Sequence, residues 1–189
     1  MTEERGSLVL MSGPSGVGKT SVSDRLLEEP GVVRAITATT RSPREGEVDG
    51  VDYFFLTEEK FREDVAAGRF LEWAEVHGRR YGTPKAPLEA QLERGHTVLL
   101  VIDVQGAQEL MEQGIPALYL FLEPPSLEEL RRRLSGRGSE DPEAFELRMK
   151  NALEELAQKN SFDHSIVNDD LDRAIEEILA RIQAAKETT

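Results

Sequence analysis

A glycine-rich stretch near the start of the chain limits what this protein can fold into more than any other feature. Residues 8–11 form an apolar run, which predicts a buried strand. The next residues fit the pattern G-x-x-x-x-G-K-[ST] at every fixed position: Gly13, Pro14, Ser15, Gly16, Val17, Gly18, Lys19 and Thr20. The glycines allow a tight turn whose backbone N–H groups converge, and a helix starting near Gly18 adds its positive end. This loop predicts a nucleoside-triphosphate site, with Lys19 on the β- and γ-phosphates and the Thr20 hydroxyl available to Mg²⁺.

A chance lysine after a glycine-rich turn is the alternative explanation of this loop. It is disfavoured because strand, loop and helix follow one another in the order that the motif requires.

Composition limits the domain size, the partners and the location that this chain is expected to have. The chain has 189 residues, enough for one domain, and a formal net charge of −13, which disfavours nucleic acid and anionic membranes as partners. No apolar stretch is long enough to predict a membrane span, and the acidic N-terminus does not resemble a signal peptide. The chain contains no cysteine, so disulfides and thiolate metal sites are excluded and a cytoplasmic location is expected.

Beyond the loop, the chain alternates between apolar runs and helical segments. Residues 97–102 are apolar throughout, which is typical of a strand buried on both faces of a parallel sheet. We therefore expect an α/β fold, a P-loop NTPase core with helices flanking a parallel sheet. Short strands and loops at 37–84 predict a small inserted α+β lobe, and residues from about 131 to 154 predict a helical lid. The expected core of this single domain is then 1–36, 85–130 and 155–189.

The individual elements are predicted from periodicity, capping residues and turn signals. Ser126 and Glu129 form a capping box for a helix that carries arginines at 131–133, of which at most one or two can face one site. Residues 134–148 are expected to form a mobile basic flap. The predicted strands are 8–11, 32–40, 52–56, 70–76, 97–102, 117–122 and 165–167, and the other predicted helices are 18–28, 58–67, 85–94, 105–113, 141–160 and a C-terminal helix.

Asp103 is a candidate site residue because it follows the apolar run 97–102. Ligands of open α/β sheets bind beyond the carboxyl ends of the strands, where Asp103 and the loop 13–20 would meet. An aspartate there can bind Mg²⁺ directly or through water. The alternative is that it only caps the next helix.

Arg41 and Arg44 are a second candidate group. Two guanidinium groups on one loop can hold a phosphate bidentately, and the nearby Tyr53 can add a hydroxyl. Arginines at such spacing are more often merely solvated, so the pair alone does not establish a site.

Glu72 stands among apolar residues, where an unpaired carboxylate is costly. Its two oxygens match the adjacent N1–H and N2–H donors of guanine, which adenine lacks, and such a match discriminates strongly between bases. The alternative is a position on the solvent face of an edge strand.

A series of motifs extends over almost the whole chain. In order, they are the loop 13–20, Thr39-Thr40-Arg41-Ser42-Pro43-Arg44 with Gly46-Glu47, Gly50 with Asp52-Tyr53, Phe70-Leu71-Glu72-Trp73, Tyr81-Gly82-Thr83, Ile102-Asp103-Val104-Gln105-Gly106, Gly136-Arg137-Gly138 and Ile166-Val167-Asn168-Asp169-Asp170. Motifs of this kind in this order resemble those of guanylate kinases.

The resemblance implies an enzyme of purine metabolism that moves the γ-phosphoryl group of ATP to GMP, with Mg²⁺ as cofactor. It also implies a role for each matching residue. Guanine would be read by Glu72, Thr37 and Thr83, and the GMP phosphate would be held by Arg41, Arg44, Tyr53 and Tyr81. The catalytic cations would be Lys19, Arg137 and Arg148, the adenine would lie beside Asn168 and Asp169, and Asp103 would lie at the junction of GMP and metal.

The chain departs from the family pattern at a few positions. Val101 stands where many members have an acidic residue, and Arg80 replaces a common tyrosine. Thr37 and Thr83 stand where serine is common, which keeps the hydroxyl.

Two alternatives to this function are a kinase for a different small acceptor and a guanylate-kinase-like module that binds proteins without catalysis. The intact loop 13–20 favours the enzyme.

Overall fold

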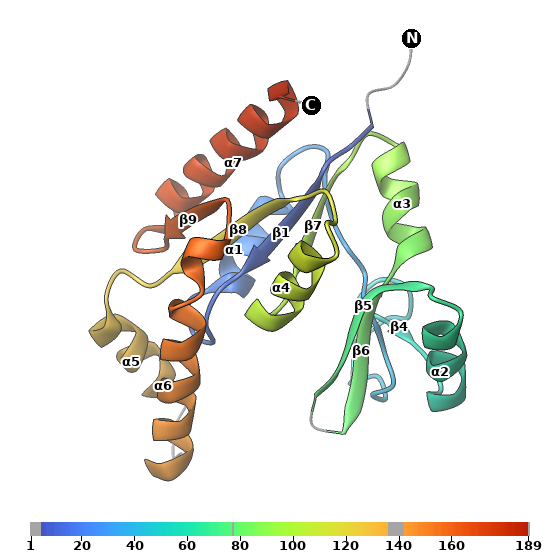
Figure 1. The fold of residues 1–189 in the computed structure, drawn as a ribbon, viewed down its shortest axis with the longest axis horizontal. Helices are drawn as coiled ribbons and strands as arrows, with labels where there is room; N and C mark the ends of the chain where they lie inside the picture. The colour runs from blue at the N-terminus through green and yellow to red at the C-terminus, as the bar shows by residue number, and fades with distance from the viewer. Residues whose placement is uncertain (1–4, 77, 136–141, 189) are drawn as a thin grey trace.

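Five parallel strands form the central sheet of the computed structural model, which describes residues 5–76, 78–135 and 142–188 (Figure 1). Because every pairing in this sheet is parallel, the carboxyl ends of its strands lie along one edge. Leu10 is paired with Leu100 on one side and with Tyr119 on the other. The order across the sheet is β2 (Val32–Arg34), β7 (Thr97–Val101), β1 (Leu8–Ser12), β8 (Leu118–Glu123) and β9 (His164–Val167).

Helices cover both faces of this sheet, as predicted from the continuous apolar runs. Along β1, Leu8 and Leu10 belong to a core cluster shared with α3 (Lys85–Glu93) and α4 (Val104–Glu112). Val9 and Met11 point to the opposite face, where they join residues of α1 (Lys19–Leu26) and α7 (Leu171–Thr188). Alternate side chains of one strand thus enter two different cores, so every residue of β1 is buried.

A second, smaller sheet lies to one side of the carboxyl edge of the central sheet (Figure 1). Its core is formed by Phe61 and Phe70, whose rings stack 4.5 Å apart, together with Ala38. Thr57 caps the accompanying helix by accepting from the Lys60 backbone N–H at 3.1 Å. The strand order is β4 (Phe54–Phe55), β3 (Ala38–Thr39), β6 (Arg79–Pro84) and β5 (Phe70–Val76), and the helix is α2 (Glu58–Ala66).

Two helices, α5 (Leu127–Ser135) and α6 (Pro142–Leu156), lie on the other side of the same edge (Figure 1). They pack on each other through the buried side chains of Leu130, Leu134, Met149 and Ala152. A short 3₁₀ helix, Lys159–Ser161, then leads to β9. Within the described residues, no helix is long and apolar enough to cross a membrane.

The predicted α/β class is confirmed, but several element boundaries were wrong. Residues 32–40 do not form one extended strand, because β2 pairs in the central sheet whereas β3 pairs in the smaller one. Strand β6 was missed, since its glycine and proline suggest a turn and only its pairing with β3 and β5 makes it a strand. The helix expected over 141–160 ends at Leu156. Residues 142–148 of the expected flap are helical, and 136–141 lie outside the described residues.

Candidate active site

The loop between β1 and α1 is shaped by glycines that no other residue could replace without strain. Gly18, the N-cap of α1, has a φ of 101°, and a Cβ there would lie 2.5 Å from the Asn168 side-chain nitrogen. Gly13 has a φ of 143°, and its Cβ would meet the Leu122 carbonyl oxygen at 2.5 Å. Val17, between them, is fully buried in the core beside α1 and α7 and anchors the loop.

Lys19, the first residue of α1, turns its side chain back over this loop. Its ammonium group donates to the carbonyl oxygens of Gly13 and, at 3.1 Å, of Pro14. Burial lowers the pKa of Lys19, whereas the nearby carboxylates of Glu155 and Asp103 oppose that shift. A cation is therefore held at the mouth of the loop, where a phosphate would need it.

Two residues far along the chain also hold the loop. The Asn168 amide, which is buried, donates to the Val17 carbonyl oxygen at 2.8 Å. Arg133 donates to the same oxygen at 3.1 Å and to the Asn168 carbonyl oxygen at 3.3 Å, and Glu129 accepts from its Nε at 2.7 Å. Of the three arginines at 131–133, Arg133 is the one bonded to the loop. Sequence reasoning could not select it, because the choice depends on how α5 is rotated.

Asp169 is not brought to the loop. Its carboxylate accepts a hydrogen bond from Arg173, in the first turn of α7, and Asp169 is exposed. No contact in this arrangement supports the prediction that Asp169 borders a nucleotide.

A cavity of about 680 Å³ lies between the central sheet and the smaller one. The core contributes residues from the carboxyl ends of its strands and from the start of α1, and the smaller sheet faces them from across the cavity. Six of the predicted site residues line it: Thr20, Thr37, Tyr53, Glu72, Tyr81 and Asp103.

Glu72 faces this cavity from β5, although β5 is an edge strand of its sheet. The hydroxyl of the fully buried Thr83 donates to Glu72 Oε1 at 2.5 Å. Burial raises the pKa of Glu72, the Thr83 hydrogen bond opposes the shift, and the charges of Asp103 and Glu109 add to it. The alternative of a solvent-facing Glu72 is therefore wrong.

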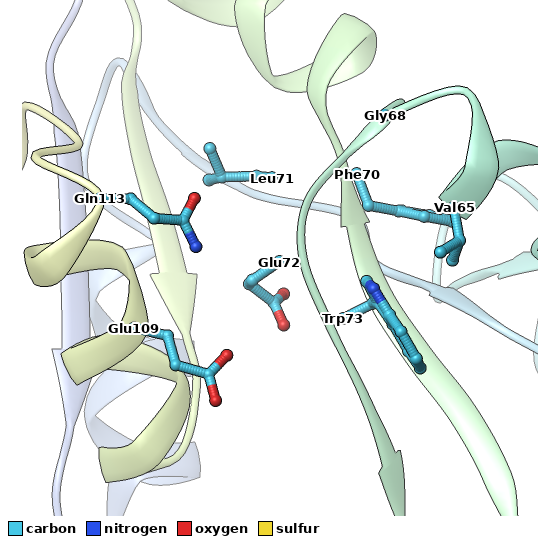
Figure 2. Close-up of a pocket in the computed structure, with 8 residues that line it drawn as sticks. All are labelled: Val65, Gly68, Phe70, Leu71, Glu72, Trp73, Glu109 and Gln113. Carbon is cyan, nitrogen blue, oxygen red and sulfur yellow. The ribbon is translucent and has the colours of Figure 1, made fainter.

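A smaller cavity of about 230 Å³ adjoins Glu72 on the side of α4 (Figure 2). Figure 2 shows the carboxylates of Glu72 and Glu109 on facing sides of this space, one from β5 and one from α4. Two carboxylates at one cavity favour a ligand with hydrogen-bond donors rather than an anion.

Arg41 is tied to a carboxylate of its own loop. It forms a bidentate pair with Glu47, with N···O distances of 2.9 and 2.8 Å, and its guanidinium lies 5.3 Å from the centre of the Tyr53 ring. The hydrogen bond with Glu47, helped by one with Tyr81, raises the pKa of Arg41. Glu47 also accepts from the Arg44 backbone N–H at 2.7 Å, so it orders the whole loop.

Asp103 caps the next helix, which was the alternative considered from the sequence, and it can still serve as a site residue. Its Oδ1 accepts from the Gly106 backbone N–H at 2.7 Å and caps α4. The residue is exposed and still lines the larger cavity with Thr20, so the cap and a role in the site are compatible.

Comparison with known proteins identifies the family. A family model described as guanylate kinase matches residues 5–185. The chain belongs to the guanylate kinase family. Guanylate kinases of Clostridium perfringens (44% identity over 185 residues, 97% of this chain and 86% of that protein) and Symbiobacterium thermophilum (46% over 186 residues, 98% and 88%) are similar to it. So is the crystal structure of guanylate kinase from Anaplasma phagocytophilum, with a TM-score of 0.75 and 34% identity, covering 98% of this chain and 88% of that one. The resemblance seen in the motifs is thus confirmed.

Of the remaining predicted residues, one lies on a described helix. Arg148 lies on α6 and is half-buried. Arg137 lies outside the described residues. Sequence reasoning missed Glu155, near the end of α6, whose Oε2 accepts from the Ser15 backbone N–H at 3.4 Å. Nothing in the sequence distinguishes it from the other glutamates of that helix.

The described residues contain no group of three or more histidine or acidic side chains placed to hold a metal ion. Thr20 and Asp103 nevertheless offer two oxygen donors at the same cavity. This donor set fits Mg²⁺, which usually takes one or two protein oxygens and fills its other positions with phosphate oxygens and water.

Proposed function

We propose that the loop 13–20 binds ATP, that the larger cavity binds GMP, and that the γ-phosphoryl group passes directly between them to give ADP and GDP. This is the reaction of the guanylate kinase family, and the chain is an ATP:GMP phosphotransferase. The observation that carries the proposal is that Glu72, with its Thr83 partner, lines the same cavity as Thr20 at the end of the loop.

Glu72 is proposed to select guanine. Its carboxylate would accept from N1–H and N2–H, and a base that lacked those donors would leave a half-buried carboxylate unpaired. The Thr83 hydroxyl fixes the orientation of the carboxylate, and Thr37 lines the same cavity with a second hydroxyl. Partial burial of Glu72 strengthens the discrimination because less water can reach the carboxylate to replace the missing donors.

Arg41, Arg44, Tyr53 and Tyr81 are proposed to hold the GMP phosphate. The Arg41 guanidinium lies beside the Tyr53 ring, and the Tyr53 and Tyr81 rings meet edge to face at 6.3 Å, so these three residues belong to one region. Arg44 is linked to them through Glu47, which accepts from its backbone N–H. Since Arg41 is paired with Glu47, the phosphate would have to share or replace that partner. A pre-ordered guanidinium loses little entropy on binding, which favours bidentate contact.

On the ATP side, the backbone N–H groups of the loop and the Lys19 ammonium are proposed to hold the β- and γ-phosphates. Arg133 and Asn168 keep the loop in shape through the Val17 carbonyl oxygen. Arg148, with Arg137, is proposed to neutralise charge on the transferring group. We also propose that Asn168 and Asp169 border the adenine.

Residues Thr20 and Asp103 would hold Mg²⁺, with Asp103 acting directly or through water. The ion supplies positive charge that offsets the charge of the phosphate oxygens. The acceptor is a phosphate oxygen that is already anionic at neutral pH, so no general base is needed. Catalysis by this chain is then positioning and charge neutralisation, with the inserted lobe 37–84 and the lid 131–154 excluding water.

A kinase for another acceptor and a non-catalytic binding module are both less well supported. The Glu72–Thr83 pair argues against a base without adjacent donors, and the intact loop argues against loss of catalysis. We further propose nucleotides, rather than nucleic acid or membranes, as the ligands of this acidic chain, and a cytoplasmic location in keeping with the absence of cysteine.

A coupled assay of ADP release tests the proposal, with ATP and Mg²⁺ and with GMP, AMP, CMP and UMP offered in turn. Turnover with GMP alone is the expected result. Turnover with a different nucleotide would refute the role of Glu72, and ATP binding without turnover on any of the four would favour the binding module.

A further inference from the structure

The carboxylate of Glu155 lies at the anion-binding face of the loop 13–20. Its Oε2 is 3.4 Å from the backbone nitrogen of Ser15, which donates to it. Glu155 is half-buried, while its neighbour Glu154 is exposed and pairs with Lys150 at 3.8 Å on the surface of α6. One acidic side chain of α6 is therefore aimed at the loop and the next one is not.

The electrostatic interactions of the loop agree with this orientation of Glu155. Burial raises the pKa of Glu155, and the Lys19 charge opposes that shift, as does the Ser15 hydrogen bond. In turn, the Glu155 carboxylate opposes the lowering of the Lys19 pKa by burial. One group is thus formed by the Glu155 carboxylate, the Ser15 backbone N–H and the Lys19 ammonium, and the carboxylate is its anion.

We propose that Glu155 is a built-in anion of the phosphate loop, which the polyphosphate chain of the incoming nucleotide must displace. The proposal rests on ATP binding at this loop. A carboxylate and a phosphate near the same ammonium repel each other, and they compete for N–H groups that converge on one spot. Part of the intrinsic affinity of the loop for phosphate is consequently used to move Glu155 away.

The displacement is coupled to the rest of α6. Glu155 and Arg148 are seven residues apart, two helical turns, so they lie on the same side of the helix. Helix α6 is packed on α5 through Met149 and Ala152, so the pair responds together. When a phosphate takes the place of the Glu155 carboxylate at one end of α6, its negative charge would draw Arg148 toward it, because Arg148 lies on the same side of the helix. Glu155 is then a positioning residue that links nucleotide entry to the placement of Arg148.

Binding measured by calorimetry on the full chain, without GMP, tests the proposal. The probes are ATP and inorganic tripolyphosphate, the second of which contacts only the phosphate site. Glu155→Gln keeps the size and removes the charge, and both dissociation constants should fall about tenfold, a change typical of coupled sites. In turnover, the KM for ATP should fall while the KM for GMP stays unchanged. Glu154→Gln, the charge-matched control, should leave all four quantities unchanged.

Three outcomes would overturn the proposal: unchanged affinity in Glu155→Gln, weaker affinity, or an equal gain in Glu154→Gln. Glu155→Asp, which keeps the charge, should not gain affinity as Glu155→Gln does; an equal gain would mean that packing rather than charge is responsible. Failure of the proposed function looks different, because the parent protein would then bind neither probe or would release no ADP with GMP.

Discussion

Glutamine in place of Glu72 removes the carboxylate charge and keeps the size of the side chain. The parent carboxylate can accept two hydrogen bonds from guanine while Thr83 donates to Oε1 at 2.5 Å. Glutamine keeps one acceptor and turns an N–H group toward a guanine donor. A hydrogen bond to a charged group contributes about 1.5–3 kcal/mol, so the loss should be roughly 2–4 kcal/mol of transition-state binding. At about 1.4 kcal/mol per factor of ten, kcat/KM for GMP should fall by one and a half to three orders of magnitude.

The same substitution should not weaken the fold. Since burial raises the pKa of Glu72 above its ordinary value, ionisation of this group opposes folding. Its contribution to stability is full below the pKa of the unfolded chain and is lost as the pH rises through the raised pKa of the folded state. Glu72→Gln should therefore melt at the same temperature as the parent or higher at pH 7.5, and the advantage should disappear at about pH 4, below the ordinary glutamate pKa.

Steady-state assays with GMP as the varied substrate and thermal melts at both pH values provide the measurements. Glu63→Gln, an exposed charge-matched change on α2, is the control and should alter neither quantity. A fall of less than threefold in kcat/KM for GMP, in a variant that melts normally, would refute the assignment of guanine recognition to Glu72.

Four further predictions follow from the loop and the cores. Lys19→Ala should lower turnover by about three orders of magnitude or more, yet leave calorimetric GMP binding within twofold; normal turnover would contradict its role. Arg133→Gln should raise the KM for ATP about tenfold because it removes one hydrogen bond to the loop, at the Val17 carbonyl oxygen, and one to Asn168, which itself holds the loop, whereas Arg132→Gln should not. Phe61→Ala, in the fully buried core of the smaller sheet, should cost about 3 kcal/mol or more in denaturant unfolding, and a cost below 1 kcal/mol would refute the packing argument. Hydrogen bonds with Arg132 and Arg133 lower the pKa of Glu129 to about 2, so Glu129→Gln should lower Tm at pH 7, and the difference should shrink as the pH falls from about 4.3 toward 2.

Features that depend on neighbouring residues could be predicted from the sequence. The strand, loop and helix around Lys19 follow from an apolar run, from glycines at positive φ and from the spacing of the motif. The apolar run that became β7 indicated a strand covered on both faces, and the cap that Asp103 provides for α4 was one of the two roles considered for it. These preferences act within a few residues, so they can be read without knowing the fold.

Tertiary structure decided which distant residues meet. Strand β6 exists because β3 and β5 pair with it, and Arg133 contacts Val17 because α5 packs in one rotation rather than another. The choice between Glu154 and Glu155 is of the same kind, because two adjacent helix positions point about 100° apart and only packing fixes which one faces the loop. Sequence alone determined that this chain has a phosphate loop. Long-range packing determined which side chains surround the loop, because burial and chain geometry are not encoded in any local pattern.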